Sequence, residues 1–156
     1  MARIVRAAGA VGDLHAFSGP RTGIVFLPGF ASVRGGVKGE ALLEEGRRGG
    51  HPVLRLDYRG HGDSGTPLED FTVGGGVEDV VAMLRAPEVR RSMTGAVLVG
   101  SSIGGWIALL ASAQVPELVS GGAPAPRARR RAGAGELPAH HRRPPPQARR
   151  WRGSCS

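Results

Sequence analysis

One stretch of the sequence, Gly95–Trp106, constrains the fold more than any other. It reads G-A-V-L-V-G-S-S-I-G-G-W, so four consecutive apolar residues lead directly into a glycine-flanked pair of serines. An uninterrupted apolar run predicts a strand that is buried on both faces. The residues from Trp106 to Ala113 are apolar and compatible with a helix. A strand, a tight turn and a helix in this order predict a nucleophile elbow, in which Ser102 satisfies the pattern G-x-S-x-G.

The segments before this stretch alternate between strand and helix patterns. We predict buried strands over Gly23–Leu27, Pro52–Leu56 and Ala96–Val99. We predict helices over Lys38–Arg48, over Val77–Arg85 and from Trp106 to about Gln114. Such alternation predicts an α/β fold with a mostly parallel sheet and helices on both faces. This is about half of a doubly wound domain.

Two short edge strands are expected before the first buried strand. They cover Ile4–Arg6 and Leu14–Phe17, and we expect Gly12–Asp13 to form the turn between them.

Positive charge is concentrated near the end of the chain. Of 21 Lys+Arg and 13 Asp+Glu, residues 120–156 hold nine arginines and one acid, Glu136, which leaves 12 of each in residues 1–119. From Gly121 onward the sequence contains no Ile, Val, Phe, Tyr or Met. Such a segment buries too little apolar surface to offset the backbone entropy that ordering costs. We therefore predict a partial α/β domain over residues 1–120 and a disordered Arg/Pro/Ala/Gly-rich tail over residues 121–156.

The origin of this tail has two interpretations. Its vocabulary of Arg, Ala, Pro and Gly is also what GC-rich coding sequence yields when it is read out of frame, and the change falls where another strand is expected to begin. We favour an out-of-frame tail on this composition. The alternative is a non-catalytic protein whose evolved basic tail binds an anionic partner such as RNA or anionic lipid. Without a folded platform, we expect no specific nucleic-acid binding.

The elbow pattern suggests where chemistry takes place. A serine at a helix N-terminus lies where the helix dipole and free N–H groups favour negative charge. The N–H of Ile103 can donate to an oxyanion that forms beside Ser102. The second donor is expected in the loop after an earlier buried strand, where Pro28-Gly29-Phe30 places the N–H of Phe30.

Several His and Asp side chains are candidate partners of this serine. His61 and Asp63 lie two residues apart in a Gly-rich loop before Ser102, whereas in this kind of fold the acid and the histidine follow the serine. We interpret them as structural loop residues, and Asp57 as a carboxylate that organises the same loop. His140 and His141 follow the serine, but they lie in the tail with nothing to orient them.

These residues together resemble the α/β-hydrolase superfamily, from about Gly23 to Ser120. The segments that carry the resemblance are F-L-P-G-F at 26–30, V-K-G-E-A-L at 37–42, R-L-D-Y-R-G-H-G-D-S-G at 55–65 and L-V-G-S-S-I-G-G-W at 98–106. Within the superfamily the chain is most similar to acyl-protein (palmitoyl-protein) thioesterase-like serine hydrolases. The sequence after about residue 120 does not match.

The resemblance implies the N-terminal half of an α/β-hydrolase fold, with Ser102 as nucleophile and the N–H groups of Ile103 and Phe30 as oxyanion donors. The implied substrates are small-molecule or acyl-protein (thio)esters, hydrolysed through an acyl-enzyme on Ser102. The triad acid and histidine belong after residue 120, where nothing matches them. Since loss of the triad histidine costs on the order of 10⁴–10⁶ in rate, we expect a truncated hydrolase with weak or no activity.

The remaining expectations concern cofactors and location. The one cysteine, Cys155, gives neither a disulfide framework nor a zinc cluster, and we expect no cofactor and no metal. No run approaches the roughly 18 apolar residues of a membrane span. The first residues lack a secretory apolar region, although arginines without an acid before Asp13 are also a property of transit peptides. The default expectation is a cytoplasmic protein.

Overall fold

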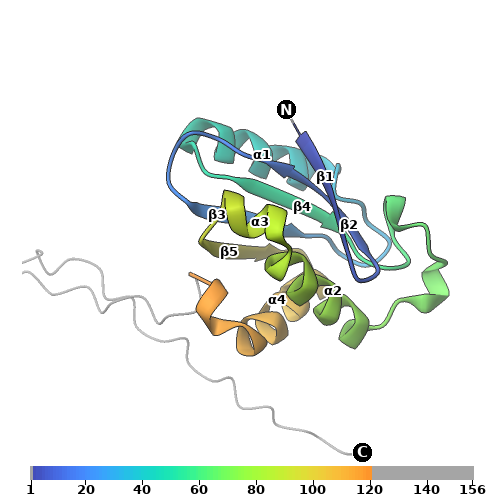
Figure 1. The fold of residues 1–156 in the computed structure, drawn as a ribbon. Helices are drawn as coiled ribbons and strands as arrows, with labels where there is room; N and C mark the ends of the chain where they lie inside the picture. The colour runs from blue at the N-terminus through green and yellow to red at the C-terminus, as the bar shows by residue number, and fades with distance from the viewer. Residues whose placement is uncertain (1, 121–156) are drawn as a thin grey trace, which may run out of the picture. The chain divides into compact units, whose positions relative to one another are not determined.

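The fold is that of a computed structural model, which describes residues 2–120 (Figure 1). Five strands form one mixed sheet in the order β1-β2-β4-β3-β5. They are β1 (Ala2–Ala7), β2 (Ala10–His15), β3 (Thr22–Leu27), β4 (Val53–Asp57) and β5 (Gly95–Gly100). Strands β3, β4 and β5 are parallel, whereas β2 pairs antiparallel with both β1 and β4. The predictions for residues 121–156 lie outside the described residues.

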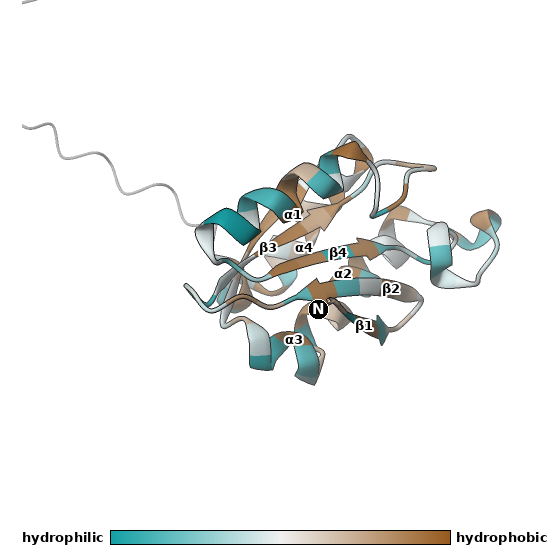
Figure 2. Ribbon diagram, turned by 90° about the horizontal axis from the view of Figure 1, so that it is seen from above, coloured by the Kyte–Doolittle hydropathy of each residue, from teal (hydrophilic) through white to brown (hydrophobic). Residues whose placement is uncertain are grey.

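Helices cover both faces of this sheet (Figures 1 and 2). They are α1 (Val37–Gly49), α2 (Val73–Arg85), α3 (Pro87–Ser92) and α4 (Ile103–Gln114). Short 3-10 helices cover Gly62–Ser64, Leu68–Asp70 and Pro116–Leu118. Helix α1 packs on β3 and β4, and α2 packs against α4 on the opposite face. The α/β fold class is thereby confirmed.

The centre of the sheet is its most apolar part. All five residues of β4 are buried, and β3 and β4 appear as brown ribbons in Figure 2. Val80 and Met83 of α2 and Ile107 of α4 are fully buried on the face of the sheet that these two helices cover. Each such side chain contributes about 1.5–3 kcal/mol through its burial, so the two-sided packing fixes the strands that lead into the elbow.

The N-terminal hairpin corrects one prediction. Its turn lies at Ala8 and Gly9, where Ala8 adopts a φ of 50°, and the predicted turn at Gly12–Asp13 is wrong. Gly12 lies inside β2 instead, where it pairs with Val5 of β1 and with Leu56 of β4. A Cβ on Gly12 would lie 3.0 Å from the carbonyl oxygen of Arg55.

Helix α2 begins earlier than its apolar spacing predicts. Its first turn contains Gly74–Gly76, and the hydroxyl of Thr72 accepts a hydrogen bond from the Gly75 N–H at 3.0 Å. This cap compensates for the low helix propensity of glycine. A Cβ on Gly76 would lie 2.9 Å from Cδ1 of Ile107, so the glycine allows α2 and α4 to approach closely.

The outer edge of β5 is only lightly paired in the described residues. Val119 forms an isolated parallel bridge with Ala96, and the Ser120 N–H donates to the Ala96 carbonyl oxygen at 2.7 Å. This pairing lies where the sequence predicts that another strand begins. None of the helices in residues 2–120 combines the length and apolarity needed to cross a membrane.

Candidate active site

Ser102 occupies the turn between β5 and α4. Its φ of 54° and ψ of −122° are unusual for a residue other than glycine. Such a backbone conformation costs on the order of 1–3 kcal/mol and persists only where the surrounding structure enforces it. Hydrogen bonds on both sides hold the turn: the Ser101 N–H donates to the Leu27 carbonyl at 3.0 Å, and the Gly105 N–H donates to the Ser102 carbonyl at 2.8 Å.

The glycines on either side of the serines are required by close backbone approach. A Cβ on Gly100 would lie 2.3 Å from the carbonyl carbon of Gly104. A Cβ on Gly104 would lie 2.2 Å from the carbonyl oxygen of Leu27 in β3. By contrast, a Cβ on Gly105 would meet its nearest neighbour at 3.7 Å. The pattern G-x-S-x-G is thus a packing requirement where β5, α4 and the end of β3 meet.

The loop after β3 lies directly against this turn. A Cβ on Gly29 would lie 3.3 Å from the carbonyl oxygen of Ser101 and 3.6 Å from Cβ of Ser102. Phe30 follows on the loop, and its side chain is largely exposed. No described residue accepts a hydrogen bond from the N–H of Phe30 or of Ile103. The structure therefore brings together the three residues that the sequence assigns to the site, and within residues 2–120 neither N–H group is engaged in a hydrogen bond.

The same loop is tied at three points to the segment that follows β4. The Tyr58 hydroxyl donates to the Pro28 carbonyl at 3.3 Å, and the Ala31 N–H donates to Nε2 of His61 at 3.0 Å. Arg34 binds Asp57 through both its backbone N–H, at 2.6 Å, and its guanidinium group. The sequence motif D-Y-R-G-H-G at 57–62 thus positions the loop that carries Phe30.

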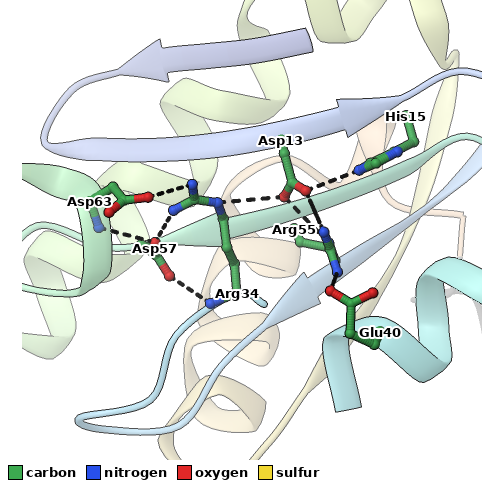
Figure 3. A network of polar contacts seen from close by, with 7 residues as sticks. All are labelled: Asp13, His15, Arg34, Glu40, Arg55, Asp57 and Asp63. Carbon is green, nitrogen blue, oxygen red and sulfur yellow. Dashed lines mark hydrogen bonds and ion pairs between the residues drawn. The ribbon is translucent and has the colours of Figure 1, made fainter. Parts of the chain in front are cut away.

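Arg34 belongs to a network of charged side chains behind this loop (Figure 3). Its guanidinium group donates to Asp63 at 2.7 Å and lies 3.6 Å from Asp13. Arg55 connects Asp13 to Glu40 of α1, with an Nη1–Oε1 distance of 2.6 Å to Glu40. The network therefore joins β2, β4, α1 and the two loops. It also lines a hollow of about 330 Å³ behind the Phe30 loop.

The buried charges shift one another's protonation equilibria. Burial alone would raise the pKa of Asp13, but hydrogen bonds from Arg55 and His15 and their charges hold this pKa below its usual value. Burial alone would lower the pKa of Arg34 and of Arg55. Their carboxylate partners nevertheless raise both values, so both guanidinium groups stay charged.

His61 and Asp57 are engaged in these structural contacts rather than with Ser102. Nε2 of His61 accepts from Ala31, and its Nδ1 lies 3.2 Å from the Arg59 carbonyl oxygen. Asp57 is 1% exposed and binds Arg34. These contacts agree with the interpretation of both residues as loop residues. Among residues 2–120, no three His, Cys, Asp or Glu side chains gather in an arrangement that could hold a metal ion.

An open hollow of about 550 Å³ lies beside Ser102, on the α1 face of the sheet. It is lined by four apolar side chains, those of Phe26, Ala41, Leu42 and Val99, and by Lys38, Ser101 and Ser102. The Lys38 ammonium group donates to the Ser101 hydroxyl at 2.7 Å, so the two neighbouring serines differ in their surroundings. Sequence reasoning missed this lysine because nothing in local spacing relates residue 38 to residue 101.

Comparison with known proteins decides the family. The chain matches the profile described as "Alpha/beta hydrolase family" over residues 24–155. The chain belongs to the α/β hydrolase family. This confirms the resemblance stated from the motifs, and the profile match also extends past residue 120.

Among curated α/β hydrolases, the chain is similar to mammalian proteins named "Palmitoyl-protein thioesterase ABHD10, mitochondrial". It is 38% identical to the mouse protein over 105 residues, which are 65% of this chain and 33% of the relative. It is 36% identical to the human protein over 105 residues, which cover 65% of this chain and 32% of that one. The chain thus spans about a third of the length of these relatives.

Solved structures of α/β hydrolases agree with this assignment. Mouse alpha/beta hydrolase domain-containing protein 10 superimposes with a TM-score of 0.65 and 32% identity, over 76% of this chain and 46% of the mouse chain. A putative hydrolase from Agrobacterium vitis S4 gives a TM-score of 0.64 and 27% identity, over 74% of this chain and 46% of that one. The strands and helices described above therefore follow an α/β-hydrolase fold.

Proposed function

We propose that Ser102 is the nucleophile of a serine hydrolase that acts on carboxylic esters or thioesters, of the acyl-protein thioesterase or esterase type. The observation that carries the proposal is the backbone of Ser102, held at a φ of 54° between β5 and α4 with Gly29 packed against it. Strain of this kind persists where surrounding contacts enforce it, and it is common at functional sites. Membership of the hydrolase family supports a chemical role for the strained serine.

The reaction follows from this arrangement. The Ser102 oxygen attacks the carbonyl carbon of the ester or thioester, and its proton goes to a general base. The N–H groups of Phe30 and Ile103 stabilise the oxyanion of the tetrahedral intermediate. Expulsion of the alcohol or thiol leaves an acyl-enzyme on Ser102, which water then hydrolyses to release the carboxylic acid.

The general base is not identified among residues 2–120. Within residues 2–120, the buried His61 is hydrogen-bonded to the backbone of Ala31 and Arg59. No described His or acid makes a hydrogen bond to Ser102. A serine without a base is a weak nucleophile at neutral pH. We therefore expect the chain as written to react slowly. The alternative of a basic tail that binds an anionic partner depends on residues outside the described part.

The substrate class is taken from the relatives. The curated relatives carry names of palmitoyl-protein thioesterases, and the wall of the hollow beside Ser102 contains Phe26, Leu42 and Val99. An apolar wall favours an acyl chain over a polar group through burial of its CH₂ groups. We propose small-molecule or acyl-protein (thio)esters as substrates. The cytoplasmic location stays a prediction, and "mitochondrial" is part of the relatives' names.

Reaction with an alkyl fluorophosphonate tests the nucleophile, and added imidazole can supply the base. We expect a single covalent adduct to form slowly, as measured by intact-mass spectrometry. The rate of adduct formation should rise with imidazole concentration. Ser102→Ala should abolish the adduct. Ser101→Ala is the matched control, because it removes the neighbouring hydroxyl and should leave the adduct.

Two results would overturn parts of this proposal. An adduct that persists in Ser102→Ala, or no adduct on Ser102 at any imidazole concentration, would remove Ser102 as the nucleophile. Fast labelling without imidazole would instead contradict the expected lack of a base, and would leave the nucleophile assignment intact.

A further inference from the structure

His61 makes contacts that define its protonation state. The side chain is 4% exposed. Its Nδ1 lies 3.2 Å from the carbonyl oxygen of Arg59, and its Nε2 lies 3.0 Å from the backbone nitrogen of Ala31. A carbonyl oxygen can only accept, and a backbone N–H can only donate. The ring is therefore neutral, with its proton on Nδ1 and with the lone pair of Nε2 accepting from the Ala31 N–H.

Three aromatic side chains contact the His61 ring. The ring centroids of Phe30 and Tyr58 lie 5.7 Å from that of His61, and that of Phe71 lies at 4.6 Å. All three contacts are edge-to-face, with interplanar angles between 74° and 83°. Such packing restricts ring rotation, so the lone pair of Nε2 keeps its direction.

The partner of that lone pair is at a strained position. Ala31 adopts a φ of 54°, which is unfavourable for a residue with a Cβ. Its N–H belongs to the peptide group that directly follows Phe30. The bond to His61 therefore fixes the orientation of this peptide and restricts the ψ angle of Phe30.

From these contacts we infer that His61 is a positioning residue for the oxyanion site: as a neutral imidazole protonated on Nδ1, it orients the Phe30–Ala31 peptide and thereby aims the Phe30 N–H toward the oxygen that reacts at Ser102. The inference rests on the function proposed above. It gives His61 a role other than that of base, for which its position in the sequence is unsuited.

The first test concerns the ring and needs no activity. A nitrogen–proton correlation spectrum of the imidazole groups of the unmodified chain should show His61 protonated on Nδ1 only. The Ala31 amide should exchange with solvent slowly. A ring protonated on Nε2, or a rapidly exchanging Ala31 amide, would overturn the inference even if Ser102 proves to be the nucleophile.

The second test uses variants. His61→Leu removes the acceptor, whereas His61→Gln keeps an oxygen at about the distance of Nε2. His51→Leu is the matched control, because Nδ1 of His51 bonds to the Thr22 carbonyl at the opposite end of β3, at 2.9 Å. We expect His61→Leu to slow imidazole-assisted labelling of Ser102 roughly 10–100-fold, the scale of a misplaced catalytic group. His61→Gln should restore part of that rate, and His51→Leu should leave it unchanged.

The outcomes separate the two proposals. Absence of Ser102 labelling in the unmodified chain would count against the proposed function, while the correlation spectrum would still report on His61. Labelling of His61→Leu at the unmodified rate would overturn the positioning role. If His61→Leu does not fold, His61→Gln and the spectrum of the unmodified chain decide. Rapid exchange of the Ala31 amide with solvent in His61→Gln would then count against the positioning role.

Discussion

The two sides of β5 differ sharply. On the side of β3, the elbow and the loop after β3 are fixed by backbone hydrogen bonds, by close glycine contacts and by the ion pair between Arg34 and the buried Asp57. On the outer side, Val97 is 38% exposed, and on the neighbouring α4 Leu109 is 74% exposed. The turn at Ser102 and the loop after β3 are therefore held by many contacts, whereas Val97 of β5 and the neighbouring α4 present exposed apolar side chains.

This difference suggests how the site is divided. The backbone of Ser102 and the loop that carries Phe30 are held by contacts among β3, β5 and the loops after β3 and β4. Substitutions on the two sides should have very different effects on the free energy of unfolding, and the following predictions use that contrast.

The largest expected effect comes from the buried end of the Arg34 contacts. Asp57→Asn removes the charge of the most deeply buried carboxylate that binds Arg34 and should lower the free energy of unfolding by about 3–5 kcal/mol. Asp63→Asn is the matched control. It binds the same arginine but has a side chain that is 72% exposed, so its cost should be about 0–1 kcal/mol. Urea unfolding, monitored by circular dichroism, measures the free energy of unfolding of both variants. Equal losses in the two variants would contradict the difference between the buried and the exposed carboxylate.

The elbow should be nearly as sensitive. Gly104→Ala places a Cβ 2.2 Å from the Leu27 carbonyl oxygen and should cost about 3 kcal/mol through forced backbone movement. Gly105→Ala, one residue later, meets nothing closer than 3.7 Å and should stabilise α4 by about 0.5–1 kcal/mol. Thermal unfolding of the two variants measures this difference in stability. A Gly104→Ala variant as stable as Gly105→Ala would mean that the elbow is less tight than described.

Asp13 predicts a dependence on pH. Its pKa is below its usual value in the folded state, so its stabilisation is fully present above the unfolded pKa of about 4 and is lost as the pH falls through the folded value. Asp13→Asn should therefore lower the free energy of unfolding by about 2 kcal/mol at pH 7. The difference from the unmodified chain should shrink progressively below about pH 4. A constant difference between pH 7 and pH 3 would contradict the assigned contacts.

The smallest effect is expected on the outer side. Leu109→Gln changes an exposed side chain and should alter the free energy of unfolding by less than about 0.5 kcal/mol. Ile107→Ala, on the buried face of the same helix, should cost about 2–5 kcal/mol. A large loss of stability in Leu109→Gln would mean that this face of α4 is covered in the protein, and would remove the contrast between the two sides.

The parts of the fold that could be predicted from sequence are those with local patterns. The apolar run of β5 and the glycines around Ser102 are adjacent in the chain, so strand, turn and helix could be predicted together. The Phe30 loop could be located because Pro28 and Gly29 end a buried strand. Helix α3 and the first turn of α2 were missed, because the former is a short polar helix and the latter depends on a threonine cap and on contact with Ile107.

The charged network could not be predicted in this way. Asp13 and Arg55 lie 42 residues apart in sequence and meet only because β2 and β4 pair. The sequence pattern Gly12–Asp13 favours a turn, and the tertiary pairing of β2 overrides it. Likewise, Lys38 reaches Ser101 and His61 reaches Ala31 only in the folded chain. A residue's role in bracing the site depends on such long-range contacts.

The central claim is that Ser102 carries the acyl group. The most direct measurement is the mass of the chain after it is incubated with a long-chain acyl thioester and imidazole and then quenched in acid. The account predicts a single added acyl group, which peptide mapping assigns to Ser102 and which is absent from Ser102→Ala. An acyl group on another residue, or undiminished thioester hydrolysis by Ser102→Ala above the rate with imidazole alone, would contradict it.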